Sequence, residues 1–311
     1  MSLYKNFVGI DIGKFEFVIS VYGKKVTKSY ENTVEGIDKF IKEHKFLQAD
    51  SLCVLEATGG YEMLLLLHLC DLKIPVHRAN TRKVKHFICS YGNAAKTDNL
   101  DAKALALYGY ERHPGLDLFT QMSEKALALY SLVQRRNDLK QMLVAEKNRL
   151  QAPNSKSLKA SFEAVIELLN SQLDDINSKI DSIIKNDEIL AQKEKALLSI
   201  PGIGKKVASE ILAILPELGH INRRQAASLA GLAPRARDSG QFKGYRSVAP
   251  GRNQIKPMLF LAAMAARNSN SELKKFYESL IARGKKKMVA LTALMRKIVV
   301  IANARLKEIC I

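Results

Sequence analysis

The sequence contains no tryptophan, only 7% aromatic residues and four cysteines among its 311 residues. The cysteines show no CxxC spacing, so neither a disulfide framework nor a zinc knuckle is indicated. The longest strongly apolar run, Met63 to Leu67, ends at His68 and falls far short of the roughly 20 residues that span a bilayer. The first residues lack the apolar core and cleavage site of a signal peptide. We therefore expect a cytoplasmic protein with no membrane partner.

Acidic residues are scarce relative to basic ones. The 49 Lys and Arg residues outnumber the 31 Asp and Glu residues, which gives a net charge of +18. Residues 223–311 contain 19 basic and 4 acidic residues and so carry +15 of this charge. Such a field attracts polyanions, and each neutralised phosphate releases counterions. A merely solubilising surface or a patch for anionic lipid is the alternative, but there is no lipidation motif and no Trp-anchored basic helix. The charge therefore favours nucleic acid as the partner.

Residues 1–120 alternate between strand and helix patterns. Three strands joined by tight turns indicate an antiparallel meander, and a continuously apolar run at 52–55 indicates a strand covered on both faces. A helix between them has Val34, Ile37, Phe40 and Ile41 on one face. Together these signals predict an α/β domain. The predicted strands are 7–12, 16–21, 26–30, 52–55 and one at Val76, and the later helices are 61–72 and several reaching about Arg112.

Residues 121–193 show only helical signals. Apolar residues form a heptad seam from Phe162 to Ile183, and a similar seam from Leu129 to Leu150 is interrupted by Arg136 and Glu146. Pro153 and Asn154 separate the two seams, so the helices either fold back as a hairpin or pair between protomers. We expect a coiled-coil spacer that makes the protein a homo-oligomer, a dimer or a tetramer.

Residues 194–311 are predicted to form a basic, mainly α domain. The segment Pro201-Gly202-Ile203-Gly204, followed by Lys205 and Lys206, resembles a helix-hairpin-helix, in which glycines allow a tight turn and the next helix offers backbone N–H groups to a phosphate. An ordinary glycine turn is the alternative. A helix to about Leu215, a second at 224–230, a loop at 231–252 rich in Gly, Pro and Arg, and two apolar-basic helices complete the domain.

Four carboxylates are candidate metal ligands. Asp11 interrupts an apolar strand between Gly9 and Gly13, and Glu56 ends the buried strand at the edge where open α/β sheets place their sites. Asp98 and Asp101 share one helix face. Carboxylates that lie close together repel one another unless a cation binds between them. Ligands that offer only oxygen atoms suit Mg²⁺ or Mn²⁺, and a pair of such ions can bind both the attacking and the leaving oxygen of a phosphodiester. Alternatively, Asp98 and Asp101 only cap a helix after Thr97 and Glu56 is an edge carboxylate.

Ser239 is a candidate nucleophile because arginines surround it in the sequence. Guanidinium groups lower the cost of charge that develops on phosphate oxygens, and Gly240 leaves the approach open. The alternative is an ordinary Asp-Ser-Gly turn. The basic residues that we expect to bind nucleic acid here are Arg235, Arg237, Lys243, Arg246 and Arg252.

Taken together, these motifs resemble the Piv/MooV-like DEDD transposases of insertion sequences over nearly the whole chain. The order and spacing of the motifs make the resemblance specific. The matching segments are GIDIGK at 9–14, EATGGY at 56–61, KTDNLDA at 96–102, PGIG at 201–204, AGLAP at 230–234, DSG at 238–240 with Gly244, and Gly251-Arg252. One departure is Ala249-Pro250 before Gly251, where the family usually has Gly-Gly-Arg after an aromatic residue.

The resemblance implies a fold, a chemistry and partners. It implies an N-terminal ribonuclease-H/RuvC-like domain whose DEDD ligands are Asp11, Glu56, Asp98 and Asp101, and a C-terminal Transposase-20 domain whose Ser239 joins covalently to DNA. It also implies double-stranded donor and target DNA, and a structured guide RNA encoded by the element. Such an enzyme is expected at the nucleoid. A phosphoserine intermediate would retain the energy of the phosphodiester for rejoining. The two centres would meet either within one protomer or across protomers.

Two other functions fit the same residues. A RuvC-like structure-selective endonuclease would hydrolyse branched DNA with the four carboxylates alone, so Ser239→Ala would cut normally. A non-enzymatic nucleic-acid scaffold would bind tightly and salt-sensitively without any Mg²⁺-dependent product. Carboxylates inside apolar strands argue against the scaffold, because a pure binder has no need of them.

Overall fold

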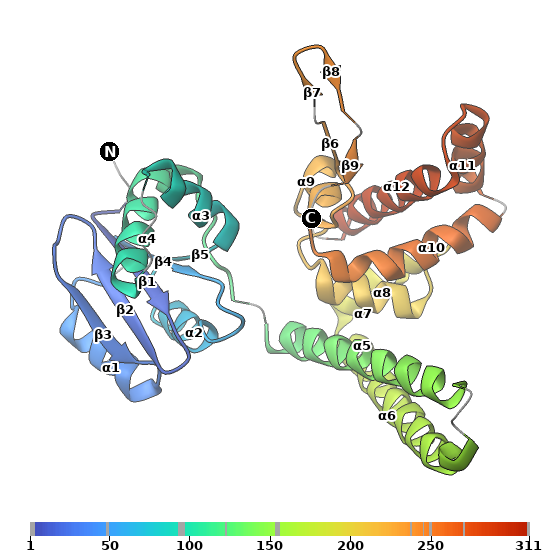
Figure 1. Ribbon diagram of the computed structural model, residues 1–311, viewed down its shortest axis with the longest axis horizontal. Coiled ribbons are helices and arrows are strands. Elements are labelled where there is room, and N and C mark those ends of the chain that lie inside the picture. The colour runs from blue at the N-terminus through green and yellow to red at the C-terminus, as the bar shows by residue number, and fades with distance from the viewer. Residues whose placement is uncertain are drawn as a thin grey trace. The chain divides into compact units, whose positions relative to one another are not determined.

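The computed structural model describes residues 4–47, 50–92, 97–121, 123–152, 156–236, 238–244, 246–248, 251–269 and 271–309. The chain divides into two compact units, Met1–Gln121 and Met122–Ile311, each with its own core (Figure 1). In the described ranges no helix combines the length and the hydrophobicity that a bilayer span requires.

The first unit is a five-stranded mixed sheet in the order β3-β2-β1-β4-β5. The first three strands form the predicted antiparallel meander, and β4 and β5 continue the sheet in parallel with β1. The α/β prediction is therefore confirmed. The elements are β1 (Asn6–Ile12), β2 (Glu16–Val21), β3 (Thr27–Glu31), α1 (Val34–Glu43), β4 (Ser51–Glu56), α2 (Met63–Asp71), β5 (Val76–Ala79), α3 (Thr81–Ser90), α4 (Asp98–Arg112) and a 3-10 turn at His113–Gly115.

Each face of this sheet is covered by two helices. Val8, Ile10, Cys53 and Leu55 pack with the buried residues of α1 and α2. The opposite face, with Phe7, Leu52 and Val54, packs with α3 and α4. Because β4 is buried on both sides, its continuous apolar run is explained. Val34, which was placed on the inner face of α1, is instead 48% exposed at the first position of the helix.

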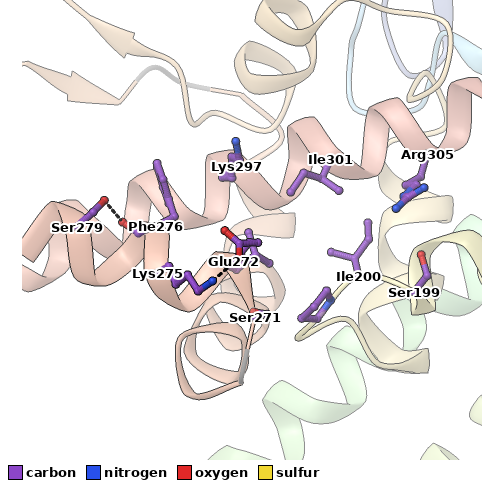
Figure 2. A pocket seen from close by; sticks show the side chains of 12 residues that line it. Ser199, Ile200, Ser271, Glu272, Lys275, Phe276, Ser279, Lys297, Ile301 and Arg305 are labelled. Atoms are coloured by element: carbon purple, nitrogen blue, oxygen red, sulfur yellow. Dashed lines mark hydrogen bonds and ion pairs between the residues drawn. The ribbon is translucent and has the colours of Figure 1, made fainter.

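The second unit consists of eight helices and four two-residue strands in the described ranges. These are α5 (Glu124–Leu150), α6 (Lys159–Lys185), α7 (Glu188–Leu198), α8 (Lys205–Ile214), α9 (Arg223–Leu229), β6 (Pro234–Arg235), β7 (Asp238–Ser239), β8 (Phe242–Lys243), β9 (Ser247–Val248), α10 (Lys256–Asn268), α11 (Glu272–Ala282) and α12 (Lys287–Lys307), with 3-10 turns at Lys156–Leu158 and Asn253–Ile255. Two C-terminal helices were predicted, whereas three follow the strands. The turn between α7 and α8, α11 and α12 surround a pocket (Figure 2).

The long helices α5 and α6 pack against each other within one chain, so the hairpin alternative is the one observed. The seam on α6 is buried at Leu169, Leu173, Ile176 and Ile180, and then shifts to Ile184 in place of Ile183. Both helices share a single core with α8, α10 and α12. The expected boundary between 193 and 194 therefore lies inside this unit and stays a prediction.

Candidate active site

Two of the four candidate carboxylates lie at the carboxyl ends of neighbouring parallel strands. The register pairs Ile10 of β1 with Leu55 of β4, so the next residues along, Asp11 and Glu56, occupy adjacent positions. Side chains alternate along a strand, which places Asp11 on the same face as Phe7 and Glu56 on the same face as Val54. That is the face covered by α4. Both carboxylates are partly exposed.

Helix α4 brings the other two carboxylates to the same edge of the sheet. A Cβ on Gly9 would lie 2.1 Å from the carbonyl oxygen of Ala102, and one on Gly109 would lie 3.7 Å from the Phe7 ring. The helix therefore runs antiparallel to β1, and its first turn lies beside the end of the strand. Asp98 and Asp101 belong to that first turn.

The start of α4 is fixed by two polar contacts. Thr97 is the N-cap, and its side-chain oxygen accepts from the backbone N–H of Leu100, as the capping alternative expected. The hydroxyl of Thr27, in β3, donates to the side-chain oxygen of Asn99 at 2.8 Å. Residues 93–96, just before this turn, lie outside the described residues.

The backbone thus gathers all four carboxylates at one edge and on one face of the sheet. The side chains themselves do not form a finished metal site: within the described ranges no group of three or more His, Cys, Asp or Glu residues could hold an ion as it stands. The donor set is nevertheless of the right kind, because hard divalent cations such as Mg²⁺ and Mn²⁺ take carboxylate oxygens. Asp11, Glu56, Asp98 and Asp101 therefore remain predicted ligands.

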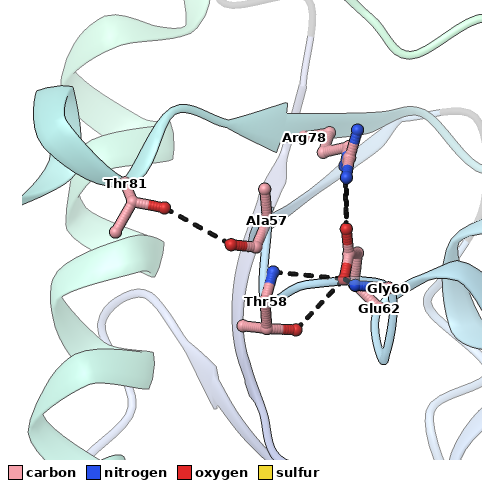
Figure 3. Close-up of polar contacts among 6 residues, drawn as sticks. All are labelled: Ala57, Thr58, Gly60, Glu62, Arg78 and Thr81. Atoms are coloured by element: carbon pink, nitrogen blue, oxygen red, sulfur yellow. Dashed lines mark hydrogen bonds and ion pairs between the residues drawn. The ribbon is translucent and has the colours of Figure 1, made fainter. Parts of the chain in front are cut away.

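The loop after Glu56 is held by a buried carboxylate that the sequence did not single out. Glu62 is fully buried, and one of its oxygens accepts from the Thr58 backbone N–H at 3.1 Å, the Thr58 hydroxyl at 3.2 Å and the Gly60 N–H at 2.9 Å (Figure 3). The other oxygen accepts two hydrogen bonds from the guanidinium of Arg78 in β5. Burial alone would raise the pKa of Glu62, but the hydrogen bonds and charge of Arg78 and the backbone N–H groups lower it overall.

A second residue outside the predicted set joins the loops that follow β1 and β4. The side-chain amide of Asn32 donates to the carbonyl of Gly13 at 3.1 Å and to the carbonyl of Tyr61 at 3.0 Å. Asn32 therefore ties the ends of the two carboxylate-bearing strands together. Its oxygen is buried without a hydrogen-bond partner among the described residues.

Ser239 lies on a narrow two-stranded arm rather than in the expected loop. Pro234 and Arg235 of β6 pair with Val248 and Ser247 of β9, and further out β7 pairs with β8. Ser239 is opposite Phe242, and Gly240, with φ of +55°, begins the connection between them. Ser239 is exposed. The Ser239 hydroxyl is therefore carried by a ribbon of two short strand pairs, β6 with β9 and β7 with β8, and not by an irregular loop.

The basic residues of the arm differ in their surroundings. Arg235 is exposed, and Arg246 is exposed and donates to the carboxylate of Asp238, beside Ser239, at 3.3 Å. Arg237 lies outside the described residues, as does the side chain of Lys243. These four residues stay predicted contacts to nucleic acid.

Arg252 has a different setting at the base of the arm. Its guanidinium donates to the carbonyl of Ile214 at 2.6 Å and to the carboxylate of Glu217 at 2.7 Å. A Cβ on Gly251 would lie 2.3 Å from the backbone nitrogen of Gly231, so the two ends of the arm meet closely here. Arg252 therefore fastens the arm to the end of α8, and its contact with nucleic acid stays a prediction.

The glycines between α7 and α8 allow a tight turn against α10. Gly202 has φ of +91°, and a Cβ on it would lie 2.3 Å from the carbonyl of Ala262. Gly204 is the N-cap of α8 and provides no side-chain cap, and it is exposed together with Lys205 and Lys206. The first N–H groups of α8 thus lie beside two cations, as a phosphate contact requires.

Sequence comparison matches the chain to two family models and to several related proteins. A transposase family model of the DEDD, IS110 type matches residues 8–153, and the model described as the transposase IS116/IS110/IS902 family matches residues 194–278. Pilin gene-inverting proteins of Moraxella lacunata and Moraxella bovis are each 26% identical to the chain over 98% of its length and 96% of theirs. An uncharacterized 43.6 kDa protein of insertion element IS110 from Streptomyces coelicolor is 32% identical, over 36% of this chain and 28% of its own.

Proposed function

We propose that this chain, which belongs to the IS110 family of transposases, cuts and rejoins DNA strands through a covalent phosphoserine intermediate formed on Ser239. Family membership supports a DNA-recombining enzyme. The finer mechanism is supported by one observation above all: the four candidate carboxylates belong to one edge of the sheet, and Ser239 is exposed on a basic arm.

The carboxylate edge supports metal-assisted chemistry. The mixed sheet, in which an antiparallel meander leads into two parallel strands, is consistent with the RuvC-like domain that the resemblance implies. Asp11, Glu56, Asp98 and Asp101 would hold Mg²⁺ or Mn²⁺ after rotation of their side chains. Such ions, when bound, would neutralise negative charge on the phosphate oxygens. Glu62 and Asn32 hold the loops that flank this edge and so limit the freedom of Glu56 and Asp11.

The step on Ser239 is a transesterification. Its Oγ forms a bond to phosphorus, the bond from phosphorus to one sugar oxygen breaks, and the serine proton is transferred overall to that leaving oxygen. A DNA hydroxyl then attacks the phosphoserine, forms the new phosphodiester and restores the serine. Arg246, which donates to Asp238 beside Ser239, and Arg235, in the pair of strands nearer the base of the arm, would favour the negative charge that develops on the phosphate.

Further parts of the proposal concern partners. The positive charge concentrated in residues 223–311 suits double-stranded DNA and a structured guide RNA. Exposed apolar side chains on α5 and α6, including Val144 at 57% and Leu168 at 60%, favour a homo-oligomer built on these helices. Val144→Lys combined with Leu168→Lys should lower the mass measured by light scattering. An unchanged mass would contradict this assembly surface.

The deciding experiment measures a protein–DNA adduct that survives denaturation, with Mg²⁺ and with nucleic acid retained during purification. Ser239→Ala should abolish both adduct and rejoining, whereas Ser247→Ala, in strand β9 nearer the base of the same arm, should retain them. Asp11→Asn should also abolish both. Normal cutting by Ser239→Ala would instead establish the hydrolytic RuvC-like nuclease, and binding without any Mg²⁺-dependent product would establish a scaffold. Sequencing the copurified nucleic acid tests the guide RNA.

A further inference from the structure

A pocket of about 620 Å³ lies between the turn that joins α7 to α8, the beginning of α11 and one face of α12 (Figure 2). Part of its lining is apolar, with Ile200, Leu273, Phe276 and Ile301 contributing. Pockets of roughly 300–1,000 Å³ accept small molecules, so this one has room for a nucleotide and not for a duplex. None of its residues belongs to the carboxylate edge or the serine arm.

Cations line the same pocket. Lys297, Ile301 and Arg305 follow a four-residue spacing, which puts them on one face of α12, with Lys297 and Arg305 about 12 Å apart along the helix axis. Lys275 also lines the pocket, paired with Glu272 at 2.7 Å. Lys297 has no acidic partner among the described residues, and its ammonium lies 5.6 Å from the centre of the Phe276 ring. An aromatic ring beside an uncompensated cation is the combination that suits a base and its phosphate.

The position of the pocket gives a second argument. Ser199, Ile200 and Pro201 line it, and they belong to the turn whose other end carries the exposed N-terminus of α8 with Lys205 and Lys206. The pocket and the N-terminus of α8 therefore border the same short turn, so one nucleic-acid ligand can contact both.

We propose that this pocket binds one unpaired nucleotide of a single strand, with the base against Phe276 and Ile301 and the phosphates at Lys297 and Arg305. This binding would serve the proposed function, because strand exchange requires unpaired bases to be held. The choice of a nucleotide as the ligand rests on the proposed function. The unpaired nucleotide has two possible sources, DNA and RNA, which share this chemistry.

The test measures binding of the full-length protein to fluorescent oligo-dT, to oligo-U and to a blunt DNA duplex. Lys297→Ala and Phe276→Leu should each weaken single-strand binding by about 5-fold or more, since stacking and phosphate contacts of this kind contribute roughly 1–3 kcal/mol per base. Phe276→Tyr should restore it, because the ring is kept. Lys287→Ala, at an exposed site at the start of the same helix, is the matched control for charge and should weaken single-strand binding less.

Preference between oligo-dT and oligo-U identifies the source of the nucleotide. Three results overturn the proposal: wild-type affinity in both pocket variants, an equal loss for the duplex, or equal competition by polyglutamate, which would indicate charge alone. Adduct formation on Ser239 is measured separately. A wild-type adduct with unchanged single-strand binding in the variants would refute the pocket and leave the recombinase intact, whereas the absence of an adduct would refute the recombinase and not the pocket.

Discussion

The guanidinium of Arg136, in α5, donates to the carboxylate of Glu210, in α8, at 2.6 Å, and each side chain is only 1% exposed. The same guanidinium donates to the Ser209 hydroxyl, and Asn137 donates to the second oxygen of Glu210. A buried pair of this kind fixes one relative position of two helices, because either charge alone is costly in an apolar core. These contacts therefore fix α5, and with it the long helical hairpin, to α8.

Removing one member of this pair should be far more damaging than removing both. Arg136→Met leaves the Glu210 charge buried without its partner and should cost about 3–5 kcal/mol of unfolding free energy. The double variant with Glu210→Gln should recover much of that loss. Denaturant unfolding followed by circular dichroism measures both. Equal stabilities of the single and double variants would show that the charges are not coupled.

Glu62 gives the first unit a defined dependence on pH. Its pKa is lower in the folded chain than the ordinary value of roughly 4.3. The ionised Glu62 therefore stabilises the folded unit at any pH above its ordinary pKa. This stabilisation is lost as the pH falls through the lower pKa that Glu62 has in the folded protein. Glu62→Gln should destabilise the unit by about 1–3 kcal/mol at pH 7, and the difference from wild type should shrink on acidification. Glu35→Gln, at an exposed site in α1, is the control, and a difference independent of pH would contradict the assignment.

The contact between Gly9 and α4 can be tested by adding one methyl group. Gly9→Ala forces a Cβ into the backbone of Ala102, so it should push α4 from the sheet, cost about 1–3 kcal/mol and reduce Mg²⁺-dependent cutting. Gly115→Ala meets no atom within 4 Å and should behave as wild type. Thermal unfolding and the adduct assay report the two effects. Full activity in Gly9→Ala would show that the first turn of α4 is not needed at this edge.

The exposed Cys89 should react with a thiol reagent much faster than the buried Cys53. Burial raises the pKa of the Cys53 thiol to about 12, while Cys89 is exposed. Short treatment with iodoacetamide at pH 8 should therefore modify Cys89 and spare Cys53 until the first unit unfolds, as peptide mass spectrometry can show. Rapid modification of Cys53 in the folded protein would mean that β4 opens readily.

Sequence periodicity predicted the first unit well, because its strands and helices bury continuous apolar faces and its glycines mark the turns. It also placed Glu56 at the end of a buried strand and Asp11 within the first strand, and the parallel register makes the two positions adjacent. The long-range polar pairs were not predictable in this way. Arg136 looked like an interruption of a seam because its partner Glu210 lies far along the chain, and Glu62 meets Arg78 only after β5 joins the sheet. Strands of two residues, such as those of the serine arm, are too short to produce a pattern.

The arm that carries Ser239 has a consequence for how such enzymes can vary. Each residue of an extended strand advances by about 3.3 Å, and successive side chains point to opposite faces. Lengthening the ribbon by one residue on each strand would turn the hydroxyl away, whereas adding two on each would carry it roughly 7 Å further outward on its original side. Because the contacts that fasten the ribbon lie at its base, at Gly231, Gly251 and Arg252, its reach can be altered in such steps without repacking the helices beneath it.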